Sequence, residues 1–195
     1  MDASLIDAVL GEAEFEQIEI LREPEIGLSA VVAIHHTRLG PAFGGVRCHP
    51  YSGLGPALAD ALRLARHMSL KCAIHEIPGG GGKVALCFTP GMDRGAVYRR
   101  LGDYIEQLGG RFYTGPDTGT QEADLLALGE RTRFVARPDA HGPGSIAEAT
   151  ALGVFAGIEA VARELDQGIA GLRVMLQGLG AVGWPLGERL AAAGA

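Results

Sequence analysis

A run of four glycines, residues 79–82, stands directly before Lys83 and an apolar stretch over residues 84–88. The glycines remove every Cβ from what reads as one short open loop, whose backbone can adopt positive φ angles and come very close to a ligand. An apolar stretch of this length predicts a buried strand. A second lysine, Lys71, lies shortly upstream. Burial and a neighbouring like charge both lower the pKa of a lysine, so the pattern predicts acid–base chemistry on a small substrate.

The glycine run also resembles two structures that lack this chemistry. A nucleotide phosphate loop needs an earlier glycine and a Ser or Thr after the lysine. Here Ile77 or Pro78 stands at the first position and Val84 at the second, which disfavours such a loop. A flexible linker is disfavoured as well, because linkers are not usually framed by strands that become buried.

The composition excludes several classes of partner. Hydrophobic residues make up 47% of the 195 residues, charged residues 21%, and the net charge is −6, as in ordinary soluble globular proteins. The arginines are scattered and no 18-residue apolar run occurs, so we expect neither a nucleic-acid nor a membrane partner. The N-terminus lacks the basic region of a secretory signal, and the odd number of widely spaced cysteines fits reduced thiols. A cytoplasmic location follows.

No metal site is expected. The three cysteines lack the close spacing of zinc ligands, whether as C-x-x-C pairs or otherwise. His35 and His36 are adjacent in a strand-like stretch, where neighbouring side chains point to opposite faces and one metal cannot easily use both.

Strands and helices alternate along the chain, which predicts an α/β domain over roughly residues 1–140. The expected strands are 15–21, 28–36, 45–48, 83–88 and 111–114, and the expected helices are 56–68, 94–108 and 120–128. A segment rich in Pro, Gly and Asp, residues 138–144, predicts a hinge. The second part, residues 141–195, then holds a helix at 147–165, a β-rich stretch at 171–177 and a helix that continues through Leu190.

A second glycine motif, G-x-G-x-x-G, follows that β-rich stretch and precedes a helix. In this context it predicts the turn of a dinucleotide-binding Rossmann domain, with the pyrophosphate at the helix N-terminus, although a tight turn without a ligand has the same pattern. The expected cofactor-binding residues are Gly178, Gly180, Ala181, Val182 and Gly183. The acidic residue expected about 20 residues further on is absent, because the sequence stops at Ala195. We therefore expect a fragment of a longer enzyme, or a chain that has lost its cofactor half and makes little NADH.

Several motifs in order resemble the Glu/Leu/Phe/Val dehydrogenase family, with the leucine and valine branch most similar. The similarity runs from about Phe15 to the C-terminus, and it includes L-G-P-A-F-G-G-V-R at 39–47, D-A-L-R-L-A at 60–65, M-S-L-K at 68–71, G-G-G-K at 80–83, D-T-G-T at 117–120, T-A-L-G-V at 150–154 and Q-G-L-G-A-V-G at 177–183. The resemblance implies an N-terminal substrate-binding and oligomerisation domain followed by the start of a Rossmann domain. It also implies a homo-oligomer assembled through the N-terminal domain.

The resemblance implies oxidative deamination of an L-amino acid to a 2-oxo acid and ammonium, with NAD as the hydride acceptor. Lys83 would be the base that deprotonates the amine and activates water, and Asp117 would move protons and help to hold the amine. Lys71 would bind the substrate carboxylate. Other substrate-binding residues implied by the matching motifs are Phe43, Gly44, Gly45, Met68, Thr150 and the glycines at 80–82. Cys72 departs from the family, which usually has Asn there.

Elementary chemistry supports the roles of the lysines. Hydride loss from Cα needs a neutral amine, so a base with a pKa near neutrality is required. Phe43 replaces the lysine that glutamate-using members carry before the two glycines. A buried distal carboxylate without a cation is costly, so we expect Phe43 to exclude glutamate, and its size to favour small aliphatic side chains.

Two alternatives remain open. One is a truncated, non-catalytic paralogue that binds amino acids or assembles with full-length subunits. The other is a different Rossmann enzyme, such as a 2-hydroxy-acid dehydrogenase, which uses His and Arg for catalysis and is disfavoured by the two lysines.

Overall fold

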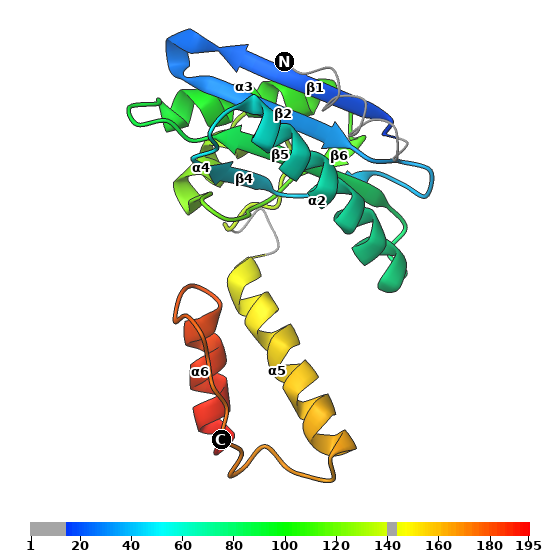
Figure 1. Ribbon diagram of the computed structural model, residues 1–195, viewed down its shortest axis with the longest axis vertical. Helices are drawn as coiled ribbons and strands as arrows, with labels where there is room; N and C mark the ends of the chain where they lie inside the picture. The colour runs from blue at the N-terminus through cyan, green and yellow to red at the C-terminus, as the bar shows by residue number, and fades with distance from the viewer. Residues whose placement is uncertain (1–14, 140–143) are drawn as a thin grey trace. The chain divides into compact units, whose positions relative to one another are not determined.

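The computed structural model describes residues 15–139 and 144–195. The chain separates into two compact units, with the division between residues 142 and 143 (Figure 1). The predicted hinge at 138–144 lies mostly outside the described residues.

The first unit is built on a six-stranded mixed sheet. Its first two strands, β1 (Gln17–Glu23) and β2 (Leu28–Ile34), form an antiparallel pair joined by a short 3-10 helix, η1 (Pro24–Ile26). Gly27 ends that helix at φ 77°, a conformation that glycine adopts without strain. The two strands expected at 15–21 and 28–36 thus form a β-hairpin.

Strand β5 (Gly80–Cys87) lies at the centre of the sheet. It pairs antiparallel with β2 on one side. On the other side it pairs in parallel with two short strands in succession, β3 (Ala42–Phe43) at its start and β4 (Val46–His49) further along. Strand β6 (Phe112–Tyr113) pairs in parallel with β3. The neighbouring edge of β5 is thus interrupted between β3 and β4.

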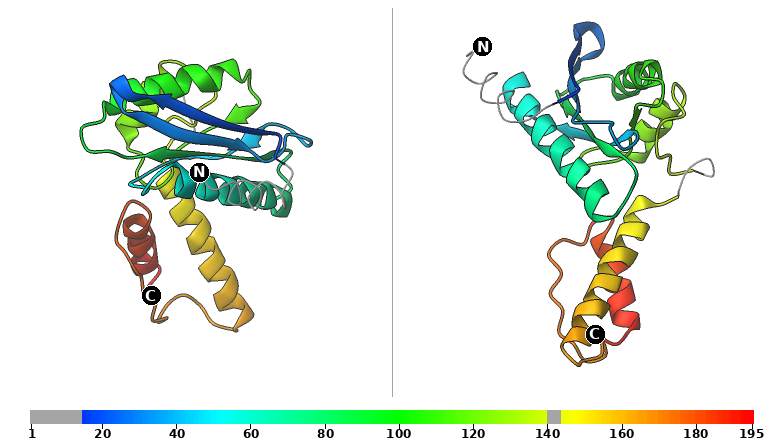
Figure 2. Two further views of the ribbon diagram at one scale, coloured as in Figure 1. Left: turned by 45° about the horizontal axis from the view of Figure 1, so that its top comes forward. Right: turned by 90° about the vertical axis from the view of Figure 1, so that its right-hand side faces the viewer.

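Helices cover both faces of this sheet (Figure 2). The 21-residue helix α2 (Leu54–Ile74) lies on one face, and α3 (Arg94–Gln107) and α4 (Glu122–Gly129) lie on the other. Alternation along the central strands divides the core in two, because successive side chains of a strand point to opposite faces. The α3–α4 face holds the larger side chains, among them Leu28, Val32, Ile34, Val84, Leu86 and Phe112.

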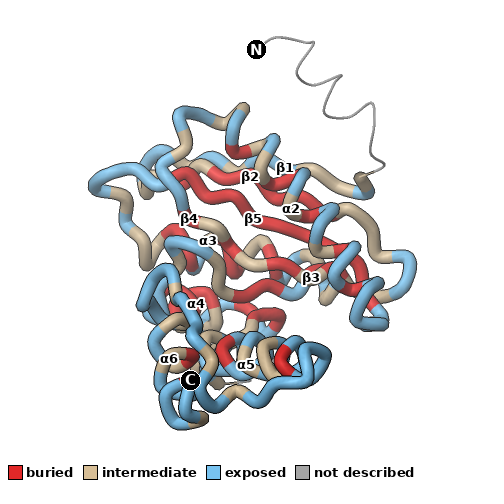
Figure 3. The backbone as a smooth tube through the Cα atoms, turned by 60° about the horizontal axis from the view of Figure 1, so that its bottom comes forward, coloured by how far each residue is buried: buried red, intermediate tan, exposed pale blue. Residues whose placement is uncertain are grey.

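The α2 face is packed with small residues. Ala33 and Ala85 of the sheet contact a cluster that includes Ala57, Ala61 and Ala65 of α2. Figure 3 shows that β2 and β5 are buried almost throughout. Small side chains on both partners let the helix approach the strands closely, and this closeness determines what the glycine run does.

The glycine run is not the open loop that the sequence suggested. Gly80, Gly81 and Gly82 are the first three residues of β5, all are buried, and none has a positive φ. They are needed because other groups lie where a Cβ would point. A Cβ built on Gly80 would lie 1.6 Å from the His36 carbonyl oxygen, one on Gly81 2.0 Å from the Ala65 carbonyl oxygen of α2, and one on Gly82 2.6 Å from the Phe112 ring. Close packing around the start of β5, rather than backbone freedom, explains the run.

The remaining expectations for the first unit are confirmed with shifted boundaries. Helix α2 begins two residues earlier and continues six residues beyond the expected end. Helix α3 ends where expected, since Gly109 and Gly110 follow it at φ 60° and 87°. Asp93 caps the start of α3 by accepting a hydrogen bond from the Ala96 amide, a typical N-cap contact.

The second unit contains α5 (Ile146–Glu164) and α6 (Gly183–Ala192), whose apolar contacts include Ala151, Leu186 and Leu190. The β-rich stretch at 171–177 is not a strand within the described residues, so this expectation is wrong for the chain as it stands. A strand needs a neighbouring strand for its backbone hydrogen bonds, and among the described residues no strand pairs with this stretch. Its Met175 is 94% exposed.

Candidate active site

Lys83 projects from the middle of β5 towards the α2 side of the sheet, the face that Ala85 and Ala33 share. The residue is 4% exposed, and its Nζ lies 3.1 Å from Oδ2 of Asp117. The sequence placed these two residues in one site on the basis of resemblance. The structure brings them into direct contact.

Asp117 lies in the loop that follows β6. This segment runs beside the start of β4, where Pro116 forms a parallel bridge with Val46. The loop then returns to the sheet, because the Thr120 hydroxyl donates to the Val46 carbonyl oxygen. Gly119 has φ 81°, and a Cβ there would lie 1.9 Å from the Cys48 carbonyl oxygen. Contacts with β4, which pairs with β5 next to Lys83, therefore determine the position of Asp117.

Glycines make room for this loop. A Cβ on Gly45 would lie 2.4 Å from the Pro116 carbonyl oxygen and 3.0 Å from Cβ of Asp117. A Cβ on Gly44 would lie 1.7 Å from the Gly82 carbonyl oxygen. Both glycines occupy the interruption between β3 and β4, beside the Lys83 segment. They allow the backbones to meet there.

The charges of the pair influence each other. Burial lowers the pKa of Lys83 below its ordinary value, the carboxylate of Asp117 opposes this, and the positive charges of Arg47 and Lys71 add to the lowering. Burial alone raises the pKa of Asp117, but the hydrogen bond from Arg47 and the charge of Lys83 outweigh it, so the net direction is down. Lys83 is thus a cation that gives up its proton unusually readily, next to a carboxylate that stays ionised.

Arg47 is a member of this site that the sequence analysis did not select. Its Nε donates to Asp117 Oδ2 at 2.7 Å, and its Nη1 donates to Asp60 Oδ2 at 3.0 Å. The Tyr51 hydroxyl donates to the same oxygen of Asp60 at 2.7 Å. A signal was present in the sequence, since a charged residue among the apolar residues of a short strand next to two glycines needs a partner.

Lys71 and Met68 lie on α2, which packs over the face that Lys83 occupies. Lys71 is in the last turn of the helix, is exposed, and makes no ion pair with any described residue. Its charge lowers the pKa of Lys83. These two are the only lysines in the 195-residue sequence. Met68 is half-buried one turn before Lys71.

Phe43 ends β3 on the same interrupted edge. A Cβ on Gly79 would lie 2.5 Å from the Phe43 ring, so the ring rests against that glycine. The Tyr113 ring of β6 lies beside it, with ring centroids 5.8 Å apart. Phe43 is half-buried and Tyr113 is 38% exposed. An aromatic surface therefore adjoins the start of β5.

The expected cofactor-binding residues and Thr150 belong to the second unit. Gly178 has φ 90°, and a Cβ on Gly183 would lie 2.1 Å from the Gly178 carbonyl oxygen, so these two glycines close a tight turn before α6. No atom lies within 4 Å of a Cβ built on Gly180. Thr150 is exposed on α5, and its hydroxyl donates to the Ile146 carbonyl oxygen at 2.7 Å. The role of Thr150 in substrate binding stays a prediction.

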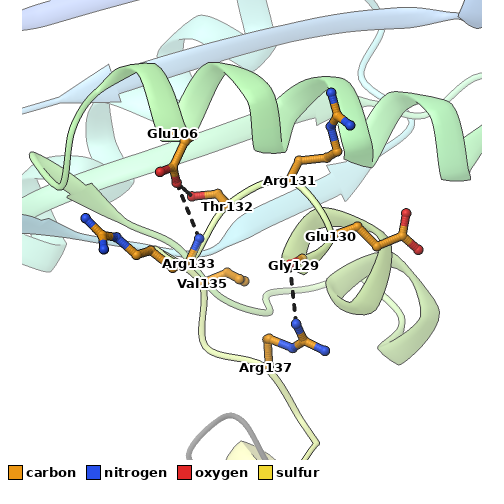
Figure 4. Close-up of a pocket in the computed structure, with 8 residues that line it drawn as sticks. All are labelled: Glu106, Gly129, Glu130, Arg131, Thr132, Arg133, Val135 and Arg137. Atoms are coloured by element: carbon orange, nitrogen blue, oxygen red, sulfur yellow. Dashed lines mark hydrogen bonds between the residues drawn. The ribbon is translucent and has the colours of Figure 1, made fainter.

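A pocket of about 580 Å³ lies elsewhere in the first unit, near the end of α4 (Figure 4). None of the predicted site residues lines it. Its charged groups already have partners, since Arg131 pairs with Asp103, Arg137 donates to the Gly129 carbonyl oxygen, and Glu106 accepts from Thr132. This pocket is therefore not the candidate active site. Among the described residues there is also no helix able to cross a membrane, and no cluster of three potential metal ligands.

The arrangement around Lys83 can transfer protons. A lysine with a lowered pKa next to an ionised carboxylate can accept a proton from a substrate and pass it on, the usual work of a general base. The exposed ammonium of Lys71, which makes no ion pair within the described part of the chain, can attract a carboxylate. Neither group needs a metal for these tasks.

Comparison with known proteins matches most of the first unit to a family model. Residues 18–133 match the model of the Glu/Leu/Phe/Val dehydrogenase dimerisation domain. A phenylalanine dehydrogenase of Bacillus thermotolerans is 41% identical over 188 residues, which cover 94% of this chain and 49% of the relative. A leucine dehydrogenase of Thermoactinomyces intermedius is 38% identical over 182 residues, covering 91% and 50%. The chain thus spans about half the length of the curated relatives it matches.

Solved structures agree. The L-tryptophan dehydrogenase from Nostoc punctiforme is 36% identical, with a TM-score of 0.73, over 97% of this chain and 54% of that one. A hetero-hexameric glutamate dehydrogenase from Thermus thermophilus shares the fold, with a TM-score of 0.74 at 22% identity, over 98% and 54%. The family suggested by the ordered motifs is confirmed: this chain belongs to the Glu/Leu/Phe/Val dehydrogenase family.

Proposed function

We propose that this chain is the substrate-binding portion of an enzyme that oxidatively deaminates an L-amino acid with an apolar side chain. The reaction is L-amino acid, NAD⁺ and water giving 2-oxo acid, ammonium, NADH and a proton. The observation that carries the proposal is the Lys83–Asp117 contact, because it supplies a base suited to a neutral-amine reaction on the face that α2 covers.

Lys83 takes the proton from the substrate ammonium, which leaves the amine lone pair free to form the imine as hydride departs from Cα. Asp117 remains ionised and holds the ammonium before that step. Lys83 releases that proton to solvent, and in its neutral form it then deprotonates the water that attacks the imine carbon. Lys71, which is exposed and has no ion pair in the described part of the chain, binds the substrate carboxylate and fixes Cα in place.

The second unit offers a turn that fits half of a dinucleotide site. Gly178 at φ 90° closes the turn, the space at Gly180 is open, and α6 begins at Gly183, so the first amides of the helix face the turn. Gly178, Gly180, Ala181, Val182 and Gly183 would hold the pyrophosphate. NAD, when bound, accepts the hydride from the substrate. The choice of NAD rather than NADP stays a prediction.

The proposed substrate class rests on Phe43. A lysine at this place would pair with a distal carboxylate, whereas an aromatic ring excludes one. We expect small aliphatic side chains, as in valine or leucine, to be preferred. Phenylalanine is the second candidate, since the relative at 41% identity is a phenylalanine dehydrogenase. The test is a panel of L-amino acids, with the rates of the wild type and of Phe43→Leu measured in parallel on the completed enzyme. Glutamate as best substrate contradicts the apolar class, and an unchanged preference in Phe43→Leu contradicts the size argument.

We further propose a homo-oligomer assembled through the first unit, because the family model that it matches is a dimerisation domain. Three free, buried cysteines suit a reducing compartment, in keeping with the cytoplasm. The alternative is a non-catalytic chain that binds amino acids or assembles with longer subunits.

The two lysines provide the test of the catalytic assignment. In a chain completed by the rest of the Rossmann domain, Lys83→Gln should lower kcat by about 10²–10⁴-fold with a modest change in KM, the range typical of general-base catalysis. Lys71→Gln should chiefly raise KM, because it removes a substrate contact. NADH formation is measured by absorbance, and circular dichroism checks the fold of each variant. A Lys83→Gln rate within a few-fold of wild type excludes Lys83 as the base. Amino-acid binding without turnover in the wild type favours the non-catalytic alternative.

A further inference from the structure

Asp117 uses only one of its two carboxylate oxygens within the described structure. Arg47 Nε, at 2.7 Å, and Lys83 Nζ, at 3.1 Å, both contact Oδ2. No described residue donates a hydrogen bond to Oδ1. Two cations on one oxygen leave the other available to an external donor such as an ammonium group.

Arg47 is itself held in place from the far end. Its guanidinium bridges Asp117 and Asp60, and Asp60 also accepts hydrogen bonds from Tyr51 and Arg63. Asp60 is on α2, while Arg47 is on β4, so the bridge ties the helix to the sheet beside the Lys83–Asp117 contact. The Asp60 and Asp117 side chains are 17% and 24% exposed. Guanidinium–carboxylate contacts are directional, so the contact of Arg47 with Asp117 orients the Asp117 carboxylate.

We propose that Arg47 is a positioning residue for the proton-transfer pair: anchored by Asp60 and Tyr51, it holds Asp117 by Oδ2, leaves Oδ1 for the substrate ammonium, and draws Asp117 away from full pairing with Lys83. This rests on the proposed function. The charged groups around Lys83 are Asp117 on the loop, Arg47 on β4 and Lys71 on α2. Without Arg47, the whole charge of Asp117 acts on Lys83. The lysine then keeps its proton to higher pH and is a weaker base at neutrality.

The two-lysine sequence allows a direct measurement without turnover. Selective ¹³C,¹⁵N-lysine labelling of the 195-residue chain gives two side-chain NMR signals, and Lys71→Arg assigns them. We expect the Lys83 signal to titrate below the ordinary range of a lysine in the wild type and to move upward in Arg47→Gln. Arg47→Lys, which keeps the charge and adds a third lysine signal, should restore most of the lowering. Arg63→Gln is the matched control, since it removes another guanidinium from Asp60 without touching Asp117, and it should leave Lys83 unchanged.

The outcomes separate this inference from the proposed function. If Lys83 titrates in the ordinary range of a lysine in the wild type, the assignment of Lys83 as the base fails. If Lys83 titrates low in the wild type but does not move in Arg47→Gln, the Arg47 inference alone fails. Should Arg47→Gln not fold, Asp60→Asn releases the anchor and is read in the same way, with Lys83 moving upward if the inference holds and staying in place if it does not.

Turnover gives a second readout. Arg47→Gln should lose about 10–100-fold in kcat near neutrality, the scale of a misplaced catalytic group. Because the defect is partly a protonation defect, the ratio of variant to wild-type rate should rise with pH. A loss that is constant across the pH range would show that Arg47 acts on the fold alone and would overturn the inference.

Discussion

Replacing Gly81 with alanine tests the close packing of α2 on β5. A Cβ at this position would lie 2.0 Å from the Ala65 carbonyl oxygen and 2.3 Å from the Ser69 amide nitrogen, both of the helix backbone. Ordinary contact begins at 3.4 Å, so the helix must retreat by about 1.4 Å. A gap of 0.5–1 Å already forfeits a quarter to a half of the dispersion energy across an interface. No side-chain rotation can relieve the contact, because the obstacle is backbone.

We expect Gly81→Ala to lower the free energy of unfolding by about 3 kcal/mol, at the upper end of the usual cost of overpacking. For a chain of this size that corresponds to a fall of roughly 6–12 °C in Tm. The assay is thermal and urea unfolding followed by circular dichroism. Without the clash, alanine should be favoured over glycine in a strand by roughly 0.5–1 kcal/mol, so the sign of the effect is decisive.

Gly95→Ala is the control in the same unit. Gly95 is in the first turn of α3, and a Cβ there meets only the flexible end of the Arg99 side chain at 3.1 Å. This variant should be as stable as wild type or slightly more stable. A Gly81→Ala chain that unfolds at the wild-type temperature or above refutes the packing of α2 against the glycines of β5.

Three further predictions concern stability and reactivity. Asp124→Asn should lower the free energy of unfolding by about 1–3 kcal/mol, because Asp124 is 4% exposed and pairs with Arg94. Glu122→Gln, on the exposed side of α4, should change it by no more than about 0.5 kcal/mol. Urea titrations of both variants measure the two values. The pKa values of Asp60 and Asp117 are lowered in the folded chain. As the pH falls below about 4, the unfolded chain therefore binds more protons than the folded chain. The two carboxylates thus stabilise the fold above that pH, and this stabilisation is lost as the pH drops through their folded pKa values. Urea titrations at a series of acidic pH values measure this loss of stability. The loss should be smaller in Asp60→Asn than in the wild type, and an equal loss would show that Asp60 does not contribute to it. The thiols of all three cysteines are buried, and burial raises their pKa values. A thiol reagent at neutral pH should therefore label the native chain slowly and should label all three cysteines in denaturant. Rapid labelling of the native chain would contradict the burial of the thiols.

The family and most of the helices and strands could be predicted because their signals are local. The helix over 54–74 has alanines and leucines at helical spacing, and Gly109 and Gly110 stop the following one. The segment at 171–177 could not be judged locally. Its β-rich sequence is real, but a strand exists only with a partner, and none of the described segments pairs with it.

The site was predicted in part for a similar reason. Lys83, Asp117 and Lys71 stand in ordered motifs, so resemblance placed them together. Arg47 and Asp60 stood in the same motifs without an assigned role, because their importance comes from a bridge between β4 and α2 that sequence spacing does not reveal.

By itself the sequence determined the alternation of strands and helices, the apolar surroundings of Lys83, and the family, since periodicity and short motifs are properties of neighbouring residues. Only the tertiary structure decided why four glycines precede Lys83. Gly80, Gly81 and Gly82 are buried residues of β5, and the places of their missing Cβ atoms are taken by His36, by the backbone of α2 and by the Phe112 ring. The place at Gly79 is taken by the Phe43 ring. The tertiary structure also decided that Lys83 and Arg47 meet on one oxygen of Asp117. That contact joins residues up to 70 positions apart, and only the pairing of β4 with β5 and the return of the chain after β6 bring them within hydrogen-bond distance.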